Sequence, residues 1–286
     1  MGTILIIGGG PAGVSAALYT ARAGIDTTII ATNSSSLIKA KEIENYYGYE
    51  SPIPGQELLE AGIKQAQRLG VTFIPEEVIG LSYTEKLTVT TKENQYMGDA
   101  VIIATGSVRN TPKIKELARF EGAGVSYCAV CDGFFYRGKD VGVLGSGEYA
   151  IHEAMELLPV AQKVTLFSNG EELKGTLPAG VSLDLRKVEG LEGENLLQAL
   201  HMEDGEMVPL SGLFIAQGVA GSTDLARKIG AGTEGNRIAV DAHMATNIPG
   251  LYAAGDCTGG LLQVAKAVYE GAEAGHSAIK YIRSLG

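Results

Sequence analysis

The fold is decided by one stretch near the start of the chain, Thr3-Ile4-Leu5-Ile6-Ile7-Gly8-Gly9-Gly10-Pro11-Ala12-Gly13. It opens with a short apolar run that glycine stops, which predicts a buried strand. A G-x-G-x-x-G pattern follows, and an alanine-rich helical pattern continues to about Gly24. A second apolar run at 27–31 completes a strand–loop–helix–strand unit. In such a unit the glycines let the backbone approach a pyrophosphate, and the helix N-terminus supplies N–H donors. The stretch therefore predicts a dinucleotide site.

This first unit lacks one expected feature at the end of its second strand. An acid that binds a ribose hydroxyl normally stands there. Here the strand ends in Ala31-Thr32-Asn33. We therefore expect ribose binding to depend on polar groups of residues 33–36.

The same unit occurs again in the middle of the chain. A strand pattern at 140–144 leads into Gly145-Ser146-Gly147-Glu148-Tyr149-Ala150, a G-x-G-x-x-A, and a helical pattern ends near Leu158. The next strand pattern covers 163–167, and a polar, Glu-rich stretch lies at 189–194. Elsewhere we expect a helix over 55–70, a hairpin around 92–94 and a helix from about Gln263. Two copies of the unit predict an α/β protein with two dinucleotide-binding, Rossmann-like domains.

Composition limits the possible functions. The chain has 286 residues, 45% of them apolar, which is enough for two domains with buried cores. Its net charge of −10 argues against nucleic acid and anionic membranes as partners. We expect no signal peptide, and no apolar run reaches the ~18 residues of a membrane span. Three cysteines favour the cytoplasm, where a disulfide is more often catalytic than structural.

Two of these cysteines form a Cys-x-x-Cys pair in the segment Cys128-Ala129-Val130-Cys131-Asp132. Such a pair can close a small disulfide ring, and a helix start favours its thiolates. Half of a zinc site is the alternative, but zinc needs four ligands and no second Cys-x-x-Cys or His-x-x-His pair is present in the sequence. We therefore interpret the pair as a redox dithiol, and the distant Cys257 as a small buried residue.

Five motifs, in this order, resemble the low-molecular-weight thioredoxin reductases over nearly the whole chain. They are Gly8 to Gly13, Glu42-Ile43-Glu44-Asn45, Ala104-Thr105-Gly106, Cys128 to Asp132, and Ala253-Ala254-Gly255-Asp256. The resemblance implies an FAD domain, residues 1–111 and 241–286, that is split by an inserted dithiol and NAD(P)-like domain, residues 112–240. It also implies FAD as cofactor, thioredoxin as protein substrate and a homodimer.

The resemblance assigns roles to single residues of the FAD domain. The first glycine loop would hold the pyrophosphate, and Asp256 would accept a ribityl hydroxyl unless it caps a helix. Asn45 and Gln263 would lie near the isoalloxazine. The family usually carries an arginine before that glutamine, and Leu262 in its place loses one charged contact. Cofactor contacts are implied for Gly8, Gly9, Gly10, Pro11, Ala12, Gly13, Ser36, Leu37, Ala104, Thr105, Gly106, Gly255 and Val264.

In the inserted domain the resemblance implies a path for two electrons from reduced flavin to the dithiol. Cys131 would face the flavin, and Cys128 would attack the disulfide of thioredoxin. Asp132 would protonate the thiolate that leaves. The alternative for Asp132 is an acid placed to favour the helix start.

The electron donor is where the sequence departs from the family. Members that use NADPH carry arginines after the second strand of the inserted domain, whereas this chain has Phe167-Ser168-Asn169-Gly170-Glu171-Glu172. Two acids there would repel a 2′-phosphate, and Glu148 opposes a pyrophosphate at the second glycine loop. The inserted domain is also short. With these features the sequence most closely resembles the ferredoxin-dependent flavin thioredoxin reductases.

Other functions stay open at this point. An NADH enzyme would use Glu171 or Glu172 to bind ribose hydroxyls, and the retained second glycine loop favours it. An NADPH enzyme, an FAD-dependent dithiol oxidase and a flavin-binding redox sensor are further alternatives. An acidic ferredoxin would need a basic patch on this acidic chain. The candidate residues are Arg109, Lys113, Lys115, Arg119, Arg137 and Lys139.

Overall fold

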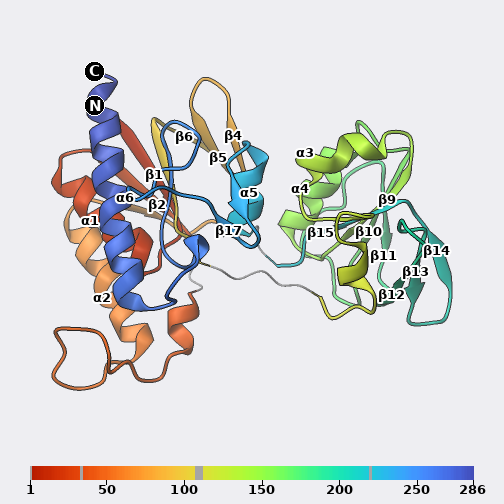
Figure 1. Ribbon diagram of the computed structural model, residues 1–286, viewed down its shortest axis with the longest axis horizontal. Helices are drawn as coiled ribbons and strands as arrows, with labels where there is room; N and C mark the ends of the chain where they lie inside the picture. Colours follow the sequence, from red (N-terminus) through yellow and green to blue (C-terminus); the bar gives the residue numbers. More distant parts are fainter. Residues whose placement is uncertain (1, 33–34, 107–111, 219–220) are drawn as a thin grey trace. The chain divides into compact units, whose positions relative to one another are not determined.

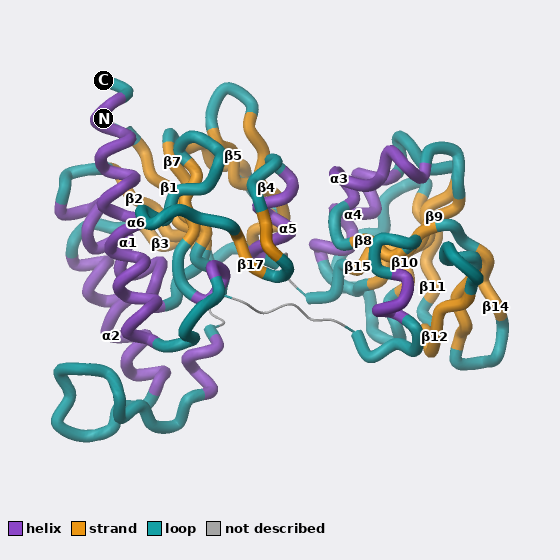
Figure 2. Tube along the Cα trace, viewed as in Figure 1, coloured by secondary structure: helices purple, strands orange, loops and turns teal. Residues whose placement is uncertain are grey.

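The computed structural model describes residues 2–32, 35–106, 112–218 and 221–286. The chain forms two compact units (Figure 1, Figure 2). Unit 1 comprises Met1–Val108 and Gly221–Gly286, and unit 2 comprises Arg109–Ala220. The predicted α/β fold, with one domain inserted into another, is confirmed.

Unit 1 is built on a sheet of five parallel strands in the order β18-β7-β1-β2-β3. These strands are β1 (Thr3–Ile7), β2 (Asp26–Ile30), β3 (Thr72–Ile74), β7 (Ala100–Ile103) and β18 (Leu251–Ala253). One face is covered by α1 (Pro11–Arg22), α2 (Gly55–Arg68) and α6 (Val264–Ser284) (Figure 1). An antiparallel sheet covers the other face, with strands β4 (Val78–Tyr83), β5 (Leu87–Thr91) and β6 (Gln95–Gly98). The turn between β5 and β6 is the hairpin predicted around residues 92–94.

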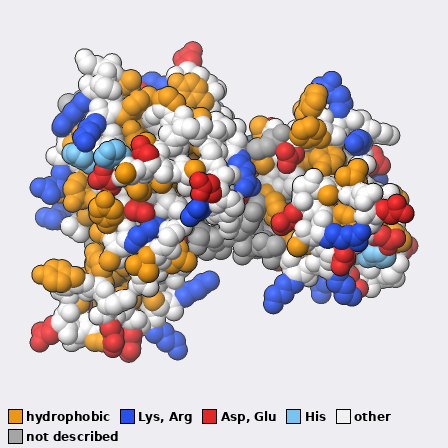
Figure 3. Space-filling view, in the orientation of Figure 1, with side chains coloured by type: hydrophobic (Ala, Val, Ile, Leu, Met, Phe, Trp, Pro, Cys, Tyr) orange, Lys and Arg blue, Asp and Glu red, His pale blue; other side chains and the backbone are white. Residues whose placement is uncertain are grey.

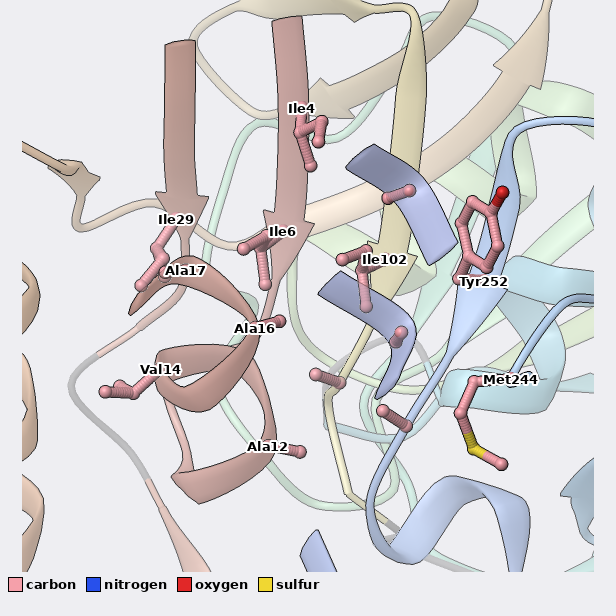
Figure 4. Packing of buried hydrophobic residues seen from close by; sticks show 14 of the residues in the cluster. Ile4, Ile6, Ala12, Val14, Ala16, Ala17, Ile29, Ile102, Met244 and Tyr252 are labelled. Atoms are coloured by element: carbon pink, nitrogen blue, oxygen red, sulfur yellow. The ribbon is translucent and has the colours of Figure 1, made fainter. Parts of the chain in front are cut away.

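Side chains of β1 alternate between these two layers, as a strand with both faces buried requires. Ile4 and Ile6 are fully buried and pack in one cluster with Ala16 of α1 (Figure 4). Leu5 points toward the antiparallel sheet and packs against Gly98 of β6. A Cβ at Gly98 would lie 2.8 Å from Leu5 Cγ. Burial of each such side chain contributes about 1.5–3 kcal/mol, so β1 ties both layers to the sheet.

Helices α1 and α6 pack so closely that glycine is required at their contact. A Cβ at Gly271 would lie 2.1 Å from the carbonyl oxygen of Ala12, and one at Gly275 would lie 2.9 Å from that of Ala16. The helix that follows the first glycine loop is therefore held backbone to backbone by the last helix of the chain. None of the helices in the described residues, α6 included, is long and apolar enough to cross a membrane.

Unit 2 repeats the parallel sheet, here in the order β11-β10-β9-β15-β8. Its strands are β8 (Val125–Ser126), β9 (Asp140–Leu144), β10 (Lys163–Phe167), β11 (Val181–Asp184) and β15 (Gly212–Ile215). The unit also contains α3 (Ala129–Asp132) and α4 (Glu148–Leu157). The short 3₁₀ helices of the described chain are η1 (Ser36–Lys39), η2 (Leu117–Phe120), η3 (Gly133–Tyr136) and η4 (Asp256–Thr258).

A second sheet in unit 2 was not predicted from the sequence. Its antiparallel strands are β12 (Val188–Glu192), β13 (Ala199–Met202) and β14 (Met207–Pro209). The polar stretch at 189–194 conceals β12, since Val188 and Leu191 bury their side chains while Glu189 and Glu192 are exposed. The alternation is too short to stand out among so many acids.

The division between the units after the inserted segment lies at residue 220, whereas the sequence placed it at 240. The intervening residues form α5 (Ser222–Lys228), β16 (Thr233–Glu234) and β17 (Arg237–Ile238). Lys228 Nζ donates to the carbonyl oxygen of Ile79, at 3.1 Å, which fastens α5 to β4 of unit 1. The predicted first boundary, after residue 111, falls outside the described residues.

The contact between α1 and α6 generates a stability prediction. Gly271→Ala should lower the free energy of unfolding by about 1–3 kcal/mol, because the new methyl group collides with backbone rather than a movable side chain. Gly62→Ala in α2 is the matched control, since its Cβ would meet only Val14 Cγ1, at 3.3 Å. Urea unfolding of the purified protein would measure both. Equal stabilities for the two variants would contradict this description of the helix contact.

Candidate functional site

Three segments that are far apart in sequence meet at the carboxyl edge of the unit 1 sheet. The first glycine loop follows β1, Ala104 to Gly106 follow β7, and Gly255 and Asp256 follow β18. Their strands are neighbours, and the pairing continues past the strand ends. Ala104 N donates to the Ile7 carbonyl at 2.7 Å, and Ala254 N donates to the Ile103 carbonyl at 2.9 Å. Ligands of open parallel sheets bind at this edge.

The first glycine loop has the geometry that a pyrophosphate needs. Gly8 has a φ of 114°, and its Cβ would lie 2.3 Å from the carbonyl oxygen of Ala104. At Gly10, by contrast, the nearest atom to a Cβ is Ser35 Oγ, at 3.9 Å, so space is open there. Helix α1 begins without a side-chain cap and without an acid in its first turn. Its first N–H groups can therefore bind an anion.

Polar groups around this edge fit a flavin dinucleotide. The Thr105 hydroxyl is buried and has no hydrogen-bond partner among the described residues. Asp256 is the first residue of η4, whose N-cap is Gly255, so the side chain of Asp256 does not serve as the cap. Asn45 Nδ2 donates to Gln263 Oε1 at 2.8 Å. The structure thus joins the two residues that we expected beside the isoalloxazine, although 218 positions separate them.

The other residues predicted to contact the cofactor lie in η1, at the start of α6 and at the start of α1. Ser36 and Leu37 lie in η1, and Leu37 packs in one apolar cluster with Val264. Leu37, Val264 and Pro11 also line an apolar pocket beside α1 and α2. Leu262, which replaces the family's arginine, is 56% exposed. Asn33, one of the residues expected to bind ribose, lies outside the described residues.

A polar cluster that sequence reasoning missed holds the turn carrying Asp256. Lys266 Nζ donates to the Gly255 carbonyl at 2.8 Å and pairs with Glu270 Oε2 at 2.9 Å. Glu270 Oε2 also accepts from Gly255 N at 2.9 Å and from Thr258 Oγ1 at 2.8 Å. A cation in the first turn of α6 opposes the helix dipole. That conflict was the available signal that Lys266 has a specific partner.

The dithiol lies on a short helix of unit 2. Helix α3 begins at Ala129, directly after Cys128, as expected for a thiol at a helix start. Cys128 is disulfide-bonded and only 2% exposed. Cys131 lies within α3, and its side chain is outside the described part of the structure.

Asp132 is held beside Cys128 by the hydroxyl of Ser126. Ser126 Oγ donates to Asp132 Oδ2 at 2.7 Å and accepts from Cys128 N at 3.1 Å. Asp132 lies in the single turn of α3 and is the N-cap residue of η3, but its side chain makes no capping hydrogen bond there. Nearby, burial and then the charge of Asp132 raise the pKa of Tyr136 above its usual value.

Three large apolar side chains beside the dithiol are exposed, and the sequence analysis did not single them out. Val130 is 50% exposed, Phe134 67% and Phe135 68%. The two phenylalanine rings meet edge to face, and the Arg137 guanidinium lies over the Phe134 ring. Adjacent phenylalanines directly after a redox motif were the signal that could have found them.

The second glycine loop is covered by a later segment of its own unit. Gly145 has a structural role, since its Cβ would lie 2.2 Å from the carbonyl oxygen of Ala216. Lys174 N donates to the Ser146 carbonyl at 2.7 Å, and Ser146 Oγ donates to Glu171 Oε2 at 2.5 Å. A Cβ at Gly175 would lie 2.4 Å from Glu148 Oε1. Residues 171–175 and two acids thus occupy the surroundings of this loop.

Cys257 is free and fully buried, as predicted. Burial raises the pKa of its thiol to about 12, against a smaller opposing effect from its hydrogen bond to the Ala254 backbone. It is therefore unreactive at neutral pH. Within the described residues, no group of three or more histidine, cysteine, aspartate or glutamate side chains could hold a metal ion.

Comparisons with known proteins give a consistent result. A family model described as pyridine nucleotide-disulphide oxidoreductase matches residues 2–271. A curated thioredoxin reductase of Aquifex aeolicus is 34% identical over 274 residues, which cover 88% of this chain and 84% of that protein. The crystal structure of an atypical thioredoxin reductase from Desulfovibrio vulgaris Hildenborough is 43% identical, with a TM-score of 0.94 over 99% of both chains. A ferredoxin-flavin thioredoxin reductase from Clostridium acetobutylicum is 29% identical, with a TM-score of 0.71 over 99% of this chain and 98% of that one.

The Lys266 cluster generates a prediction about cofactor affinity. Lys266→Met should weaken FAD binding about 10- to 100-fold, because it leaves the largely buried Glu270 carboxylate without its cation and removes a donor from the Gly255 carbonyl at the Asp256 turn. Lys280→Met on the exposed side of α6 is the matched control and should leave the affinity unchanged. Titration of the apoprotein with FAD, followed by flavin fluorescence, would measure both. Parent-like affinity for Lys266→Met would show that this cluster does not support the site.

Proposed function

The chain belongs to the pyridine nucleotide-disulphide oxidoreductase family, and we propose that it carries two electrons from FAD through Cys128 and Cys131 to the disulfide of thioredoxin. It is a flavin-dependent thioredoxin-disulfide reductase, like the curated relatives that it matches. The feature that best supports this path is the disulfide-bonded Cys128 at the start of α3, with Asp132 held beside it by Ser126.

Residues at the carboxyl edge of the unit 1 sheet would hold the cofactor. The first glycine loop and the first N–H groups of α1 would bind its pyrophosphate. Asp256 would accept a ribityl hydroxyl, and the hydrogen-bonded pair of Asn45 and Gln263 would flank the isoalloxazine. Bound FAD supplies the two electrons that reduce the chain's own disulfide.

The reduced pair would then act by thiol–disulfide exchange. The Cys128 thiolate attacks one sulfur of the thioredoxin disulfide, and the other sulfur leaves as a thiolate. Asp132 would protonate that leaving group. Cys131 then attacks the mixed disulfide, which releases reduced thioredoxin and restores the disulfide of this chain. Two electrons and two protons pass to the substrate in each cycle.

The surface beside the dithiol suits a protein substrate better than a small thiol. Val130, Phe134 and Phe135 expose apolar side chains within a few residues of Cys128. Exposed aromatic residues are enriched where proteins bind one another. We propose that thioredoxin docks on these three residues.

Ferredoxin is our proposed electron donor. The second glycine loop carries Glu148, and its Ser146 is already bonded to Glu171. A pyridine nucleotide would have to displace residues 171–175 and bring its phosphates close to two acids. The hydrogen bond from Ser146 engages the carboxylate of Glu171, one of the two acids, with Glu172, that an NADH enzyme would use to bind ribose hydroxyls. The glycine motif is explained without a ligand, since Gly145 packs against the Ala216 backbone.

Basic side chains of unit 2 would provide the docking site for an acidic ferredoxin. Lys113, Lys115, Arg137 and Lys139 are exposed. Arg119 is less available because it pairs with Glu116, and Arg109 lies outside the described residues. Charges at the rim of an interface act mainly on the association rate and are screened within a Debye length of ~10 Å at 0.1 M salt.

We further propose a homodimer that acts in the cytoplasm. Tyr19 on α1 and Tyr269 on α6 are 49% and 62% exposed, and hydrophobic side chains show on the surface over these helices (Figure 3). An exposed apolar surface of this kind supports association between copies. The cytoplasm is supported by the free Cys257 in a chain whose other two cysteines form the proposed redox-active pair.

The cysteine roles are testable with dithionite-reduced holoenzyme and oxidised thioredoxin under anaerobic conditions. Cys128→Ser and Cys131→Ser should both reduce the formation of thioredoxin thiols to background, whereas Cys257→Ala should leave it unchanged. Asp132→Asn should slow the reaction about 10²- to 10⁴-fold. Only Cys128→Ser should keep a long-wavelength absorbance change from Cys131 beside the flavin, and the opposite pattern would reverse the two roles.

The donor is testable by mixing the oxidised holoenzyme anaerobically with reduced ferredoxin, NADH or NADPH and recording flavin absorbance. Ferredoxin should bleach the flavin fastest. Reversal of Lys113, Lys115 and Arg137 to Glu should slow this reaction about tenfold at low salt, because it removes electrostatic steering. The deficit should shrink as salt is raised, and reduction by dithionite should be unaffected.

The matched control reverses Lys41, Lys64 and Lys280 of unit 1, which changes the net charge by the same amount. This control should react with ferredoxin at the parent's rate. Rapid bleaching by micromolar NADPH would refute the proposed donor. A triple variant of unit 2 as fast as the control would refute the proposed docking residues while leaving the donor unaffected.

A further inference from the structure

The helix that carries the dithiol is too short to be stable alone. Helix α3 spans four residues, and a helix of that length has unpaired N–H groups along its whole first turn. Two side chains from outside the helix supply acceptors. Ser126 Oγ accepts from Cys128 N at 3.1 Å, and Glu153 Oε2 accepts from Ala129 N at 2.8 Å. The conformation of the redox pair therefore depends on β8 and α4.

A glutamate is an unusual residue to accept the hydrogen bond from Ala129 N. Its side chain is 1% exposed, on the face of α4 that packs against α3. Burial of a carboxylate is costly, and a glutamine of the same shape could accept the same hydrogen bond. The position thus uses a charge where a neutral acceptor would suffice to hold the helix, and that charge faces the N–H group of the residue next to Cys128.

We propose that Glu153 is a positioning residue that also tunes the redox pair, on the premise that the pair is redox-active as proposed above. Its carboxylate accepts from the N–H of Ala129, the residue next to Cys128, and its negative charge there disfavours a Cys128 thiolate. The reduced form is thereby disfavoured relative to the disulfide. The dithiol becomes a stronger reductant, which favours electron transfer to the protein substrate.

The consequence can be measured as an exchange equilibrium. The disulfide of this chain reacts with reduced dithiothreitol to give the Cys128–Cys131 dithiol and oxidised dithiothreitol, so two electrons and two protons are transferred and every atom balances. Acid quenching and alkylation in denaturant then count the thiols by mass. The oxidised chain carries one thiol, Cys257, and the reduced chain carries three. Flavin absorbance is recorded on the same holoenzyme samples.

Glu153→Gln and Glu153→Met both remove the charge, and only Gln keeps an acceptor for Ala129 N. Both should shift the equilibrium at pH 8 about tenfold toward the dithiol, which corresponds to ~30 mV for a two-electron couple. Glu156→Gln on the same helix is the control, because its side chain is 40% exposed, and it should titrate with the parent.

A purely structural role for Glu153 makes a different prediction. Glu153→Gln would then titrate with the parent, and Glu153→Met would lose only thermal stability. Coincident titrations of the parent and either folded uncharged variant would overturn the tuning role. A parent whose thiol count does not change with dithiothreitol would instead overturn the redox function on which this inference rests.

Discussion

Parallel pairing of β18, β7 and β1 is the constraint on which the cofactor end of the molecule depends. Each strand is followed at once by a motif, and the pairing brings their carboxyl ends to one edge of the sheet. The ladder extends past the strands through Ala104 and Ala254, so the following turns are fixed by backbone hydrogen bonds. Residues near positions 8, 105 and 256 thereby form one site without any contact between their side chains being required.

Close backbone packing is the second condition for that edge. Helix α1 must approach both the end of β1 and α6, and only glycine permits the distances found at Gly13, against the Gly8 carbonyl, and at Gly271, against the Ala12 carbonyl. Close backbone packing also accounts for the glycine of the second loop, where no ligand is needed to explain it. Gly145 lies against Ala216, so a loop of this shape serves packing even where Glu148 and Glu171 surround it. A glycine motif of this kind therefore indicates close backbone packing. It indicates a ligand site only where the space next to the loop is open, as it is at Gly10.

The dithiol is held by side chains from outside its own helix, because a four-residue helix has almost no stability of its own. Ser126 and Glu153 supply the acceptors that α3 lacks, and Ser126 also orients Asp132. Short secondary structure at a reactive group depends on its neighbours, so chemistry and packing cannot be separated there. Lys266 and Glu270 have a comparable role at the Asp256 turn.

The sequence alone determined the α/β class, the two glycine loops, the redox pair and the buried Cys257, because these depend on local periodicity and on the chemistry of single residue types. It did not reveal β12, whose few inward residues are hidden among acids. It also did not reveal the division at residue 220, after which α5 packs in unit 1 and Lys228 donates to the Ile79 carbonyl, a contact that is long-range in sequence. Only the tertiary structure paired Asn45 with Gln263, placed Glu171 on Ser146 and directed Glu153 toward α3. These contacts join residues between 24 and 218 positions apart, and no local pattern encodes which distant side chain a turn or a short helix will meet.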